Sequence, residues 1–108
     1  MEEFSESGMN LILHSGDAKN AAMKALRFAR KYEFDTAEQY LKEARNHIGE
    51  AHHSQTDLLH NEAKGTTTTV SLLMVHAQDH MMNTLSFIDS SDEMIHLYKE
   101  LYEIKKEK

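Results

Sequence analysis

The sequence contains no cysteine, proline or tryptophan, and only four of its 108 residues are glycine. Without cysteine there can be no disulfide, no thiolate-bound metal and no cysteine nucleophile. Proline interrupts helices more strongly than any other residue, so its absence, together with plentiful Ala, Leu, Met, Glu, Lys and Gln, favours long unbroken helices. We therefore expect an all-α fold in a single domain, residues 1–108, because this length supports one modest core.

Long apolar runs and basic clusters are also missing. No stretch approaches the roughly 18 apolar residues of a membrane span, and the acidic start MEEFSESGMN lacks a signal-peptide pattern. The formal charge is −6, and the basic residues cluster only in the tail at Lys105, Lys106 and Lys108. This balance argues against nucleic acid as a partner and against direct membrane insertion. We expect a cytoplasmic protein.

Three segments have the periodicity of amphipathic helices, at about residues 4–32, 35–64 and 69–104. Alanine recurs every seven residues in the first segment, which allows a neighbouring helix to approach closely. Three helices of similar length joined by short turns predict an antiparallel, up-down-up three-helix bundle.

The helix ends have recognisable signals. Asp35 followed by Glu38 resembles a capping box, so we expect Asp35 to cap the second helix. Gly65 is a C-terminal stop signal for that helix. The run Thr66–Thr69 is poor in a helix interior and good at an N-cap, so we expect a turn that ends in the cap of the third helix.

The third helix has two seams at heptad spacing. One holds Met74, Ala77, Met81, Thr84, Ile88, Ile95, Tyr98 and Tyr102. The second holds Leu72, His76, Asp79, Asn83, Phe87, Met94, Leu97 and Leu101. Two seams imply two sets of neighbours, the helices of the same chain and further copies of the chain. The polar stretch Asp89–Asp92 competes for backbone hydrogen bonds, so we expect it to loosen or kink this helix.

The candidate functional segment reads VSLLMVHAQDHMM, Val70–Met82. Its residues His76, Asp79 and His80 stand at i, i+3 and i+4 and share one side of a helix. Apolar residues surround them in nearly every direction, so we expect this segment to be buried on more than one side. Ionisable groups in such a place need partners, and Asp79 has no Arg or Lys within one turn.

Antiparallel pairing also predicts which residues lie at the same height. Gln55 falls opposite Asp79, and His14 falls beside His52 and His53, so polar residues crowd one end of the bundle. A lone histidine on a half-apolar helix is more often structural than catalytic. The sequence therefore leaves the roles of His14, His52 and His53 open.

Two kinds of chemistry fit the histidines of the third helix. A neutral imidazole at His76 has a lone pair that can attack phosphorus, and no Gly-rich nucleotide loop is present, so the phosphate would arrive on another protein. Alternatively, His76 and His80 form an i, i+4 metal pair. The Glu of an HExxH motif is absent, which argues against a zinc protease.

A close family resemblance is carried by three runs, VSLLMVHAQDHMM, ILHSGDAKNAAMKAL and EARNHIGEAHHSQTDLLHNEA. They resemble the IIA component of the lactose/cellobiose (chitobiose) family of the bacterial phosphoenolpyruvate-dependent sugar phosphotransferase system, over almost the whole chain. The resemblance implies a homotrimer in which His76 accepts phosphate from the phosphocarrier HPr. It further implies that His76 passes this phosphate to a cysteine of the IIB component during uptake of a lactose/cellobiose-type disaccharide.

The same resemblance implies roles for the neighbours of His76. Asp79 matches a residue on the three-fold axis, where three carboxylates share a metal ion, usually magnesium. Gln78 and His80 match pocket residues close to the active histidine. Two other classes stay open: a histidine phosphotransfer domain of two-component signalling, although AQDH rather than xxKG follows His76, and a non-enzymatic metal-bound helical scaffold trimer.

Overall fold

The computed structural model describes residues 2–65 and 71–107, and this part of the chain is all-helical without a strand. Its helices are α1 (Glu2–Arg30), α2 (Phe34–Ala63) and α3 (Leu72–Lys106). The predicted all-α, three-helix class is therefore confirmed. The predicted helix ends differ from the observed ones by one to three residues, and the largest difference is the start of α3 at Leu72 instead of 69.

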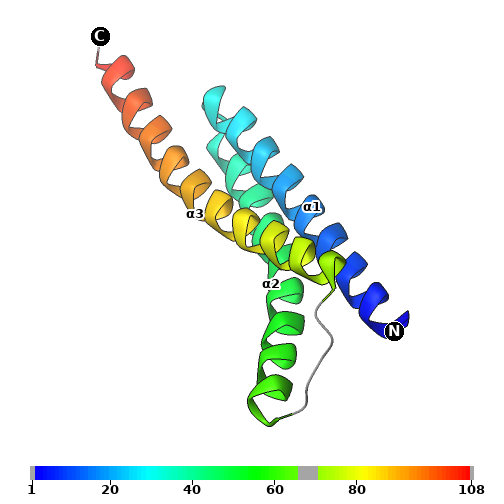
Figure 1. Ribbon diagram of the computed structural model, residues 1–108. Coiled ribbons are helices and arrows are strands. Elements are labelled where there is room, and N and C mark those ends of the chain that lie inside the picture. Colours follow the sequence, from blue (N-terminus) through cyan, green and yellow to red (C-terminus); the bar gives the residue numbers. More distant parts are fainter. Residues whose placement is uncertain (1, 66–70, 108) are drawn as a thin grey trace.

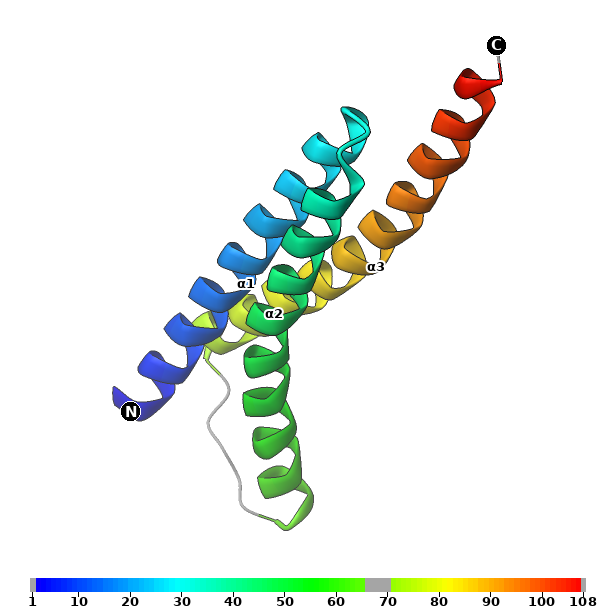
Figure 2. The ribbon, with the colours of Figure 1, turned by 180° about the vertical axis from the view of Figure 1, so that it is seen from behind.

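The three helices run up, down and up, with α2 antiparallel to α1 and α3 (Figure 1). Helix α1 packs along both other helices, whereas α2 and α3 contact each other over a shorter stretch. The C-terminal half of α2 turns away from the bundle and projects alone in both views (Figures 1 and 2). The molecule is consequently long and narrow, 61 × 22 × 19 Å.

Small residues fill the centre of the bundle. Helix α1 has five buried alanines, Ala18, Ala21, Ala22, Ala25 and Ala29, and α2 adds Ala37, Ala44 and Ala51. Larger buried side chains fill the space between them: Leu11, Leu41, Ile48, Met81, Ile88 and Ile95. The distance between packed helices depends on the side chains at the contact, so an alanine seam brings α1 and α2 close together. The predicted alanine seam of the first helix is confirmed.

The start of α2 differs from the prediction. Its N-cap is Glu33, which makes no side-chain cap bond, and the Glu33 carbonyl accepts the first helical hydrogen bond from the amide of Ala37 (3.1 Å). Asp35 lies in the first turn, so the predicted Asp35 cap is wrong. An acidic side chain in this turn is still favourable, because the helix dipole is positive there. The stop signal is confirmed, since Gly65 follows α2 with φ +92°.

The start of α3 is capped by Ser71. Its Oγ accepts a hydrogen bond from the amide of Met74 (3.1 Å), the geometry of a side-chain N-cap. The predicted threonine cap is therefore wrong, and Thr66–Thr69 themselves lie outside the described residues. The cap fixes the first turn of α3, directly before the candidate functional segment.

The turn from α1 to α2 holds a tyrosine in a backbone conformation that usually belongs to glycine. Tyr32 has φ +64°, and its amide and that of Glu33 bond back to carbonyls in the last turn of α1 at 2.9 and 3.0 Å. This Schellman geometry normally favours Gly, and a side chain there costs roughly 1 kcal/mol. The Tyr32 ring packs against Tyr102 of α3 (centroids 5.0 Å apart) and Phe34 (6.1 Å), which offsets that cost.

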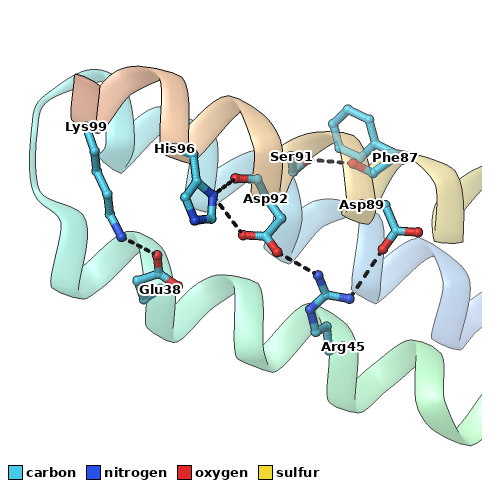
Figure 3. A network of polar contacts seen from close by, with 8 residues as sticks. All are labelled: Glu38, Arg45, Phe87, Asp89, Ser91, Asp92, His96 and Lys99. Carbon is cyan, nitrogen blue, oxygen red and sulfur yellow. Dashed lines mark hydrogen bonds and ion pairs between the residues drawn. The ribbon is translucent and has the colours of Figure 1, made fainter. Parts of the chain in front are cut away.

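Ion pairs link α2 to the middle and end of α3 (Figure 3). Arg45 contacts Asp89 at 3.4 Å and Asp92 at 3.1 Å, and Lys99 contacts Glu38 at 2.9 Å. These groups are partly exposed, and pairs of that kind usually add less than about 1 kcal/mol. Their geometry nevertheless fixes how α3 is rotated against α2.

Helix α3 continues unbroken through the polar stretch Asp89–Asp92, and its axis bends along its length in both views (Figures 1 and 2). Ser91 is buried and donates to the backbone carbonyl of Phe87 within the helix (2.7 Å), while the two aspartates face Arg45 (Figure 3). The Ser91 hydroxyl therefore shares the Phe87 carbonyl with the helix backbone without breaking the helix, while the two aspartates have a partner on α2.

The alanine seam leads to a stability prediction. We expect Ala22→Leu to lower the free energy of unfolding by about 1–3 kcal/mol, because Ala22 is fully buried and α1 cannot move away from its neighbours without losing core contacts. Urea unfolding followed by circular dichroism measures the change. Ala63→Leu, at an exposed end of α2, is the matched control and should change stability by less than about 0.5 kcal/mol. Equal effects of the two variants would contradict the seam.

The Ser71 cap leads to a local prediction. We expect Ser71→Ala to destabilise the first turn of α3 by about 1 kcal/mol and to speed hydrogen exchange at the Met74 amide. Ser71→Asp keeps an acceptor at the cap and should leave that exchange rate close to the original one. Equal exchange in all three proteins would show that the cap does not hold the turn.

Candidate functional site

Helix α3 has two opposite faces with different surroundings. One face is buried against α1 and α2 through Ala77, Met81, Thr84, Ile88, Ser91 and Ile95. The opposite face is exposed although it is largely apolar: Leu72, Val75, Met82, Met94, Leu97, Leu101 and Ile104. We call this set the open face; Leu72 is 86% exposed and Leu97 63% exposed. No helix of the described part is long and apolar enough to cross a membrane.

This arrangement bears on the expected burial of Val70–Met82. A single chain buries only one side of that segment, and Leu72, Val75 and Met82 are exposed. The predicted second seam is thus present, but the chain's own helices do not cover it. Burial on further sides requires contacts from outside the single chain.

His76 and His80 lie beside the open face, one helical turn apart. His76 is exposed, His80 is half-buried, and their ring centroids are 6.0 Å apart with a tilt of 38°. The prediction that His76 and His80 lie on the same side of the helix is therefore confirmed. An exposed imidazole next to apolar surface is accessible to a large partner that docks on α3.

Asp79 lies within the open face, between Leu72 and Met82 in the helix. Its carboxylate is exposed and accepts a hydrogen bond from Nδ2 of Asn83, one turn further on, at 3.3 Å. No Arg or Lys pairs with it among the described residues. A carboxylate in an otherwise apolar face gains a compensating charge only from outside the chain.

Gln78 belongs to another side of α3, toward α2. Its Oε1 accepts a hydrogen bond from Nε2 of Gln55, and its own Nε2 lies 3.7 Å from Sδ of Met74. Gln78 stands two residues from His76, and two residues apart on a helix do not face each other. Within one chain His80 is therefore beside His76, whereas Gln78 is not.

Gln55 is the contact that connects the projecting half of α2 to α3. The prediction placed it opposite Asp79, and it bonds the adjacent Gln78. Antiparallel counting thus found the correct height within one residue. Sequence reasoning did not assign Gln55 to the site, because counting along helices gives height but no direction around the axis.

The other histidines do not gather around His76. His14 lies 3.8 Å from Glu50, while His52 and His53 are exposed on the projecting half of α2. The predicted height of His14 is confirmed within about one turn, since Glu50 lies two and three residues before His52 and His53. These side chains do not crowd together, because His52 and His53 are exposed where α2 diverges from the bundle (Figure 1).

The residues of one chain do not form a metal centre by themselves. Over residues 2–65 and 71–107, no three His, Asp or Glu side chains come close enough to hold an ion. The His76–His80 pair accordingly lacks a third ligand from its own chain. Asp79 offers hard oxygen atoms, which suit Mg²⁺, but only further copies of the chain could complete a set around it.

Comparisons with known proteins agree with this fold. Residues 6–99 match the family model described as "PTS system, Lactose/Cellobiose specific IIA subunit". The lichenan-specific phosphotransferase enzyme IIA component of Bacillus subtilis (strain 168) is 40% identical over 102 residues, which cover 94% of this chain and 93% of that protein.

Solved structures show the same similarity in three dimensions. The cellobiose-specific enzyme IIA of Bacillus anthracis is 41% identical with a TM-score of 0.90, and the match covers 94% of both chains. The IIA(chitobiose)–HPr complex of the Escherichia coli phosphotransferase system gives 35% identity and a TM-score of 0.81, covering 94% of this chain and 99% of that one. This chain therefore belongs to the lactose/cellobiose family of IIA subunits of the phosphotransferase system, and it is a phosphotransferase component.

Proposed function

We propose that the protein is a cytoplasmic phosphocarrier that takes a phosphoryl group from phosphorylated HPr onto His76. It then delivers the group to a cysteine of the IIB component during uptake of a lactose/cellobiose-type disaccharide. The observation that carries this proposal is the exposed His76 imidazole at the edge of the apolar open face. The relative from Escherichia coli, whose structure contains HPr, supports HPr as the donor.

The first transfer exchanges one nitrogen–phosphorus bond for another. The lone pair of neutral His76 attacks phosphorus while the bond to the donor histidine breaks. The donor ring, protonated on its other nitrogen, leaves as neutral imidazole with the electron pair of that bond. The His76 ring takes up the positive charge, so atoms and charge balance. In the second transfer a thiolate sulfur attacks phosphorus and His76 leaves in the same way.

The chain contributes position and surroundings to this transfer. Little covalent chemistry is required of the protein in phosphoryl transfer, and most catalysis comes from alignment and from donors to the phosphoryl oxygens. The ring centroid of His80 lies 6.0 Å from that of His76, which places His80 to donate a hydrogen bond to those oxygens. The alternative role of His80 is to fix the tautomer of the His76 ring.

We further propose that the protein is a homotrimer held together by the open face of α3. The exposed apolar residues of this face lie on one side of the helix, and those near its end, Met94, Leu97, Leu101 and Ile104, recur at spacings of three and four, the pattern by which parallel helices pack around a common axis. Monomeric proteins rarely expose so many large apolar residues along one side of a helix. Packing three copies by this face would remove Leu72, Leu97 and Ile104 from water.

Asp79 sets a condition for such a trimer. Three carboxylates that meet near an axis repel one another unless a cation or protons compensate them. We propose that the Asp79 side chains of the three copies hold a divalent cation, most simply Mg²⁺, which would link the subunits. The donor set fits, because carboxylate oxygen is the ligand that Mg²⁺ prefers and the side chain is exposed on the open face.

The phosphocarrier proposal is tested on His76. We expect His76→Ala to abolish labelling by phosphoenolpyruvate, the general phosphotransferase enzyme and HPr, while helix content and solution mass stay unchanged. Acid-labile phosphate measured by mass spectrometry is the readout. His96→Ala, another exposed histidine on α3, is the matched control and should be labelled normally. Full labelling of the His76 variant would refute the assignment, and no labelling of the original protein would favour a scaffold.

The axial role of Asp79 has a separate test. We expect Asp79→Leu to keep the trimer and to make its dissociation independent of EDTA, because three apolar side chains replace three charges at the axis. Sedimentation velocity over a dilution series, with Mg²⁺ or with EDTA, measures this. Asp89→Leu, which changes an exposed aspartate outside the open face, should keep the cation dependence of the original protein. A trimer whose dissociation still depends on EDTA in the Asp79→Leu variant would contradict the axial cation, whereas a monomeric variant would mean either that Asp79 is not axial or that the metal is essential for assembly.

A further inference from the structure

The outward side of the C-terminal half of α1 carries basic side chains and no acidic one. From Ala18 to Tyr32 the chain has no Asp or Glu, and all its basic residues there are exposed: Lys19, Lys24, Arg27, Arg30 and Lys31. At about 100° per residue, these side chains fall within a sector of about 140°. The buried alanines of α1 occupy the opposite side of the helix. We call this set of basic residues the basic face.

The chain itself does not compensate the charges of the basic face. Among the described residues, no member of this face forms an ion pair with a carboxylate. Lys24 lies at the edge of the face, in a groove between α1 and α2 that also contains Asp17 and Glu43. The other members do not line that groove. A chain with a formal charge of −6 therefore has one side that is positively charged.

Aromatic rings lie beside two ammonium groups of this face. Nζ of Lys31 is 5.5 Å from the ring centroid of Phe28, and Nζ of Lys24 is 5.6 Å from that of Tyr40. The two rings are half-buried and stack on each other with centroids 5.4 Å apart. Basic side chains next to aromatic rings are typical of protein surfaces that lie against a membrane.

The basic face is not a run in the sequence, where basic residues cluster only in the tail. Its members are spread over residues 19–31 and come together because residues three and four apart share one side of a helix. They extend over about 18 Å, at about 1.5 Å per residue. The folded helix is therefore needed to form this surface.

The basic face is distant from His76. Gly8 of α1 lies beside Leu73 of α3, because a Cβ atom on Gly8 would be 3.3 Å from Cγ of Leu73. Helices α1 and α3 run in the same direction (Figure 1), so Arg27 lies about 16 residues, or about 24 Å, further along the bundle than His76. A partner of the basic face and a partner at His76 consequently bind at separate places. The proposed trimer also leaves the basic face uncovered, since α3 packs on the alanine side of α1.

The shape of the basic face decides between two negatively charged partners. Its side chains stand on one convex helix, so they present charge over an area and not within a pocket of fixed geometry. Such a surface fits many mobile lipid headgroups better than it fits the fixed carboxylates of one protein. At physiological ionic strength charges act over about 8 Å. The molecule is 22 × 19 Å across, so a membrane at the basic face is screened from the acidic residues of the far side.

We propose that the basic face of α1 binds the anionic lipid headgroups of a membrane surface. Arg27 and Arg30 donate hydrogen bonds to lipid phosphates, which their planar guanidinium groups match, and Lys19 and Lys31 add charge. The contact involves headgroups and requires no insertion of a helix. The inference goes beyond the proposed function, because it needs neither His76 nor a phosphoryl group. It keeps the carrier next to the membrane across which the sugar is taken up.

Vesicle sedimentation tests this contact. The probes are vesicles of phosphatidylcholine with about 30% phosphatidylglycerol, and vesicles of phosphatidylcholine alone. We expect binding to the anionic vesicles only, and release from them at high salt. Each basic group near an anionic surface changes the partition coefficient about fivefold, so Arg27→Gln combined with Arg30→Gln should lower it about 25-fold.

Two matched pairs of substitutions control for charge and for folding. Arg27→Lys combined with Arg30→Lys keeps both charges and should bind within about threefold of the original protein. Lys42→Gln combined with Lys64→Gln removes the same charge from exposed positions on α2, and should change binding by less than about twofold. Circular dichroism checks that helix content is unchanged. An equal loss of binding in both Gln pairs would show that only net charge matters and would overturn the basic face.

The remaining outcomes separate the possible partners. Equal binding of the original protein to the two kinds of vesicle overturns the proposal. If vesicles do not bind it, and Arg27→Gln combined with Arg30→Gln instead weakens binding to the purified IIB component, the face serves an acidic protein and the lipid proposal is also overturned.

Failure of this inference is distinguishable from failure of the proposed function. Without vesicles, Arg27→Gln combined with Arg30→Gln should take up phosphate from phosphorylated HPr within about twofold of the original rate, because His76 lies far from these charges. A protein that binds anionic vesicles but takes up no phosphate refutes the proposed function and supports the basic face. A protein that takes up phosphate but binds both kinds of vesicle equally does the reverse.

Discussion

The open face of α3 is the constraint on which the rest of the structure depends. The alanine-rich contacts with α1 and α2 bury one side of this helix, and the other side exposes apolar residues in two groups, Leu72–Met82 and Met94–Ile104, with polar residues such as Asn83 and Ser90 between them. Contact with water along such a stripe is unfavourable by about 25 cal/mol for each Å² of apolar surface. Covering this stripe with copies of the same helix removes that cost. It also leaves His76, at its edge, accessible to partners.

The shape of the bundle connects this face to the chemistry. Alanines such as Ala22 and Ala44 bring the helices close together, and the molecule is only about 20 Å thick in cross-section. Beyond Ala51 no residue of α2 is buried, and this half touches α3 through Gln55. Gln55 lies at the start of the diverging half of α2. Its side-chain amide therefore lies beside the turn of α3 that carries Gln78 and His76. Capping by Ser71 keeps that turn helical.

Much of the fold was predictable, because heptad spacing and helix propensity are local properties of the sequence. Both seams of the third helix, the Gly65 stop and the pairing of His76 with His80 followed from them. One wrong prediction was local, because Ser71 rather than a threonine caps α3 through the Met74 amide; others involve residues distant in sequence. Asp35 is not the cap because the aromatic contacts of Phe34 with Tyr102 start the helix earlier. The stretch Asp89–Asp92 stays helical, and Arg45 of α2 pairs with both of its aspartates.

The central claim is that copies of the chain cover the open face of α3. Its most direct test is the solution mass of the original protein, measured by light scattering at micromolar concentration with Mg²⁺ present. The account predicts three times the mass of one chain. A protein that stays at the mass of one chain, with Leu72 and Leu97 still exposed to water, would contradict it.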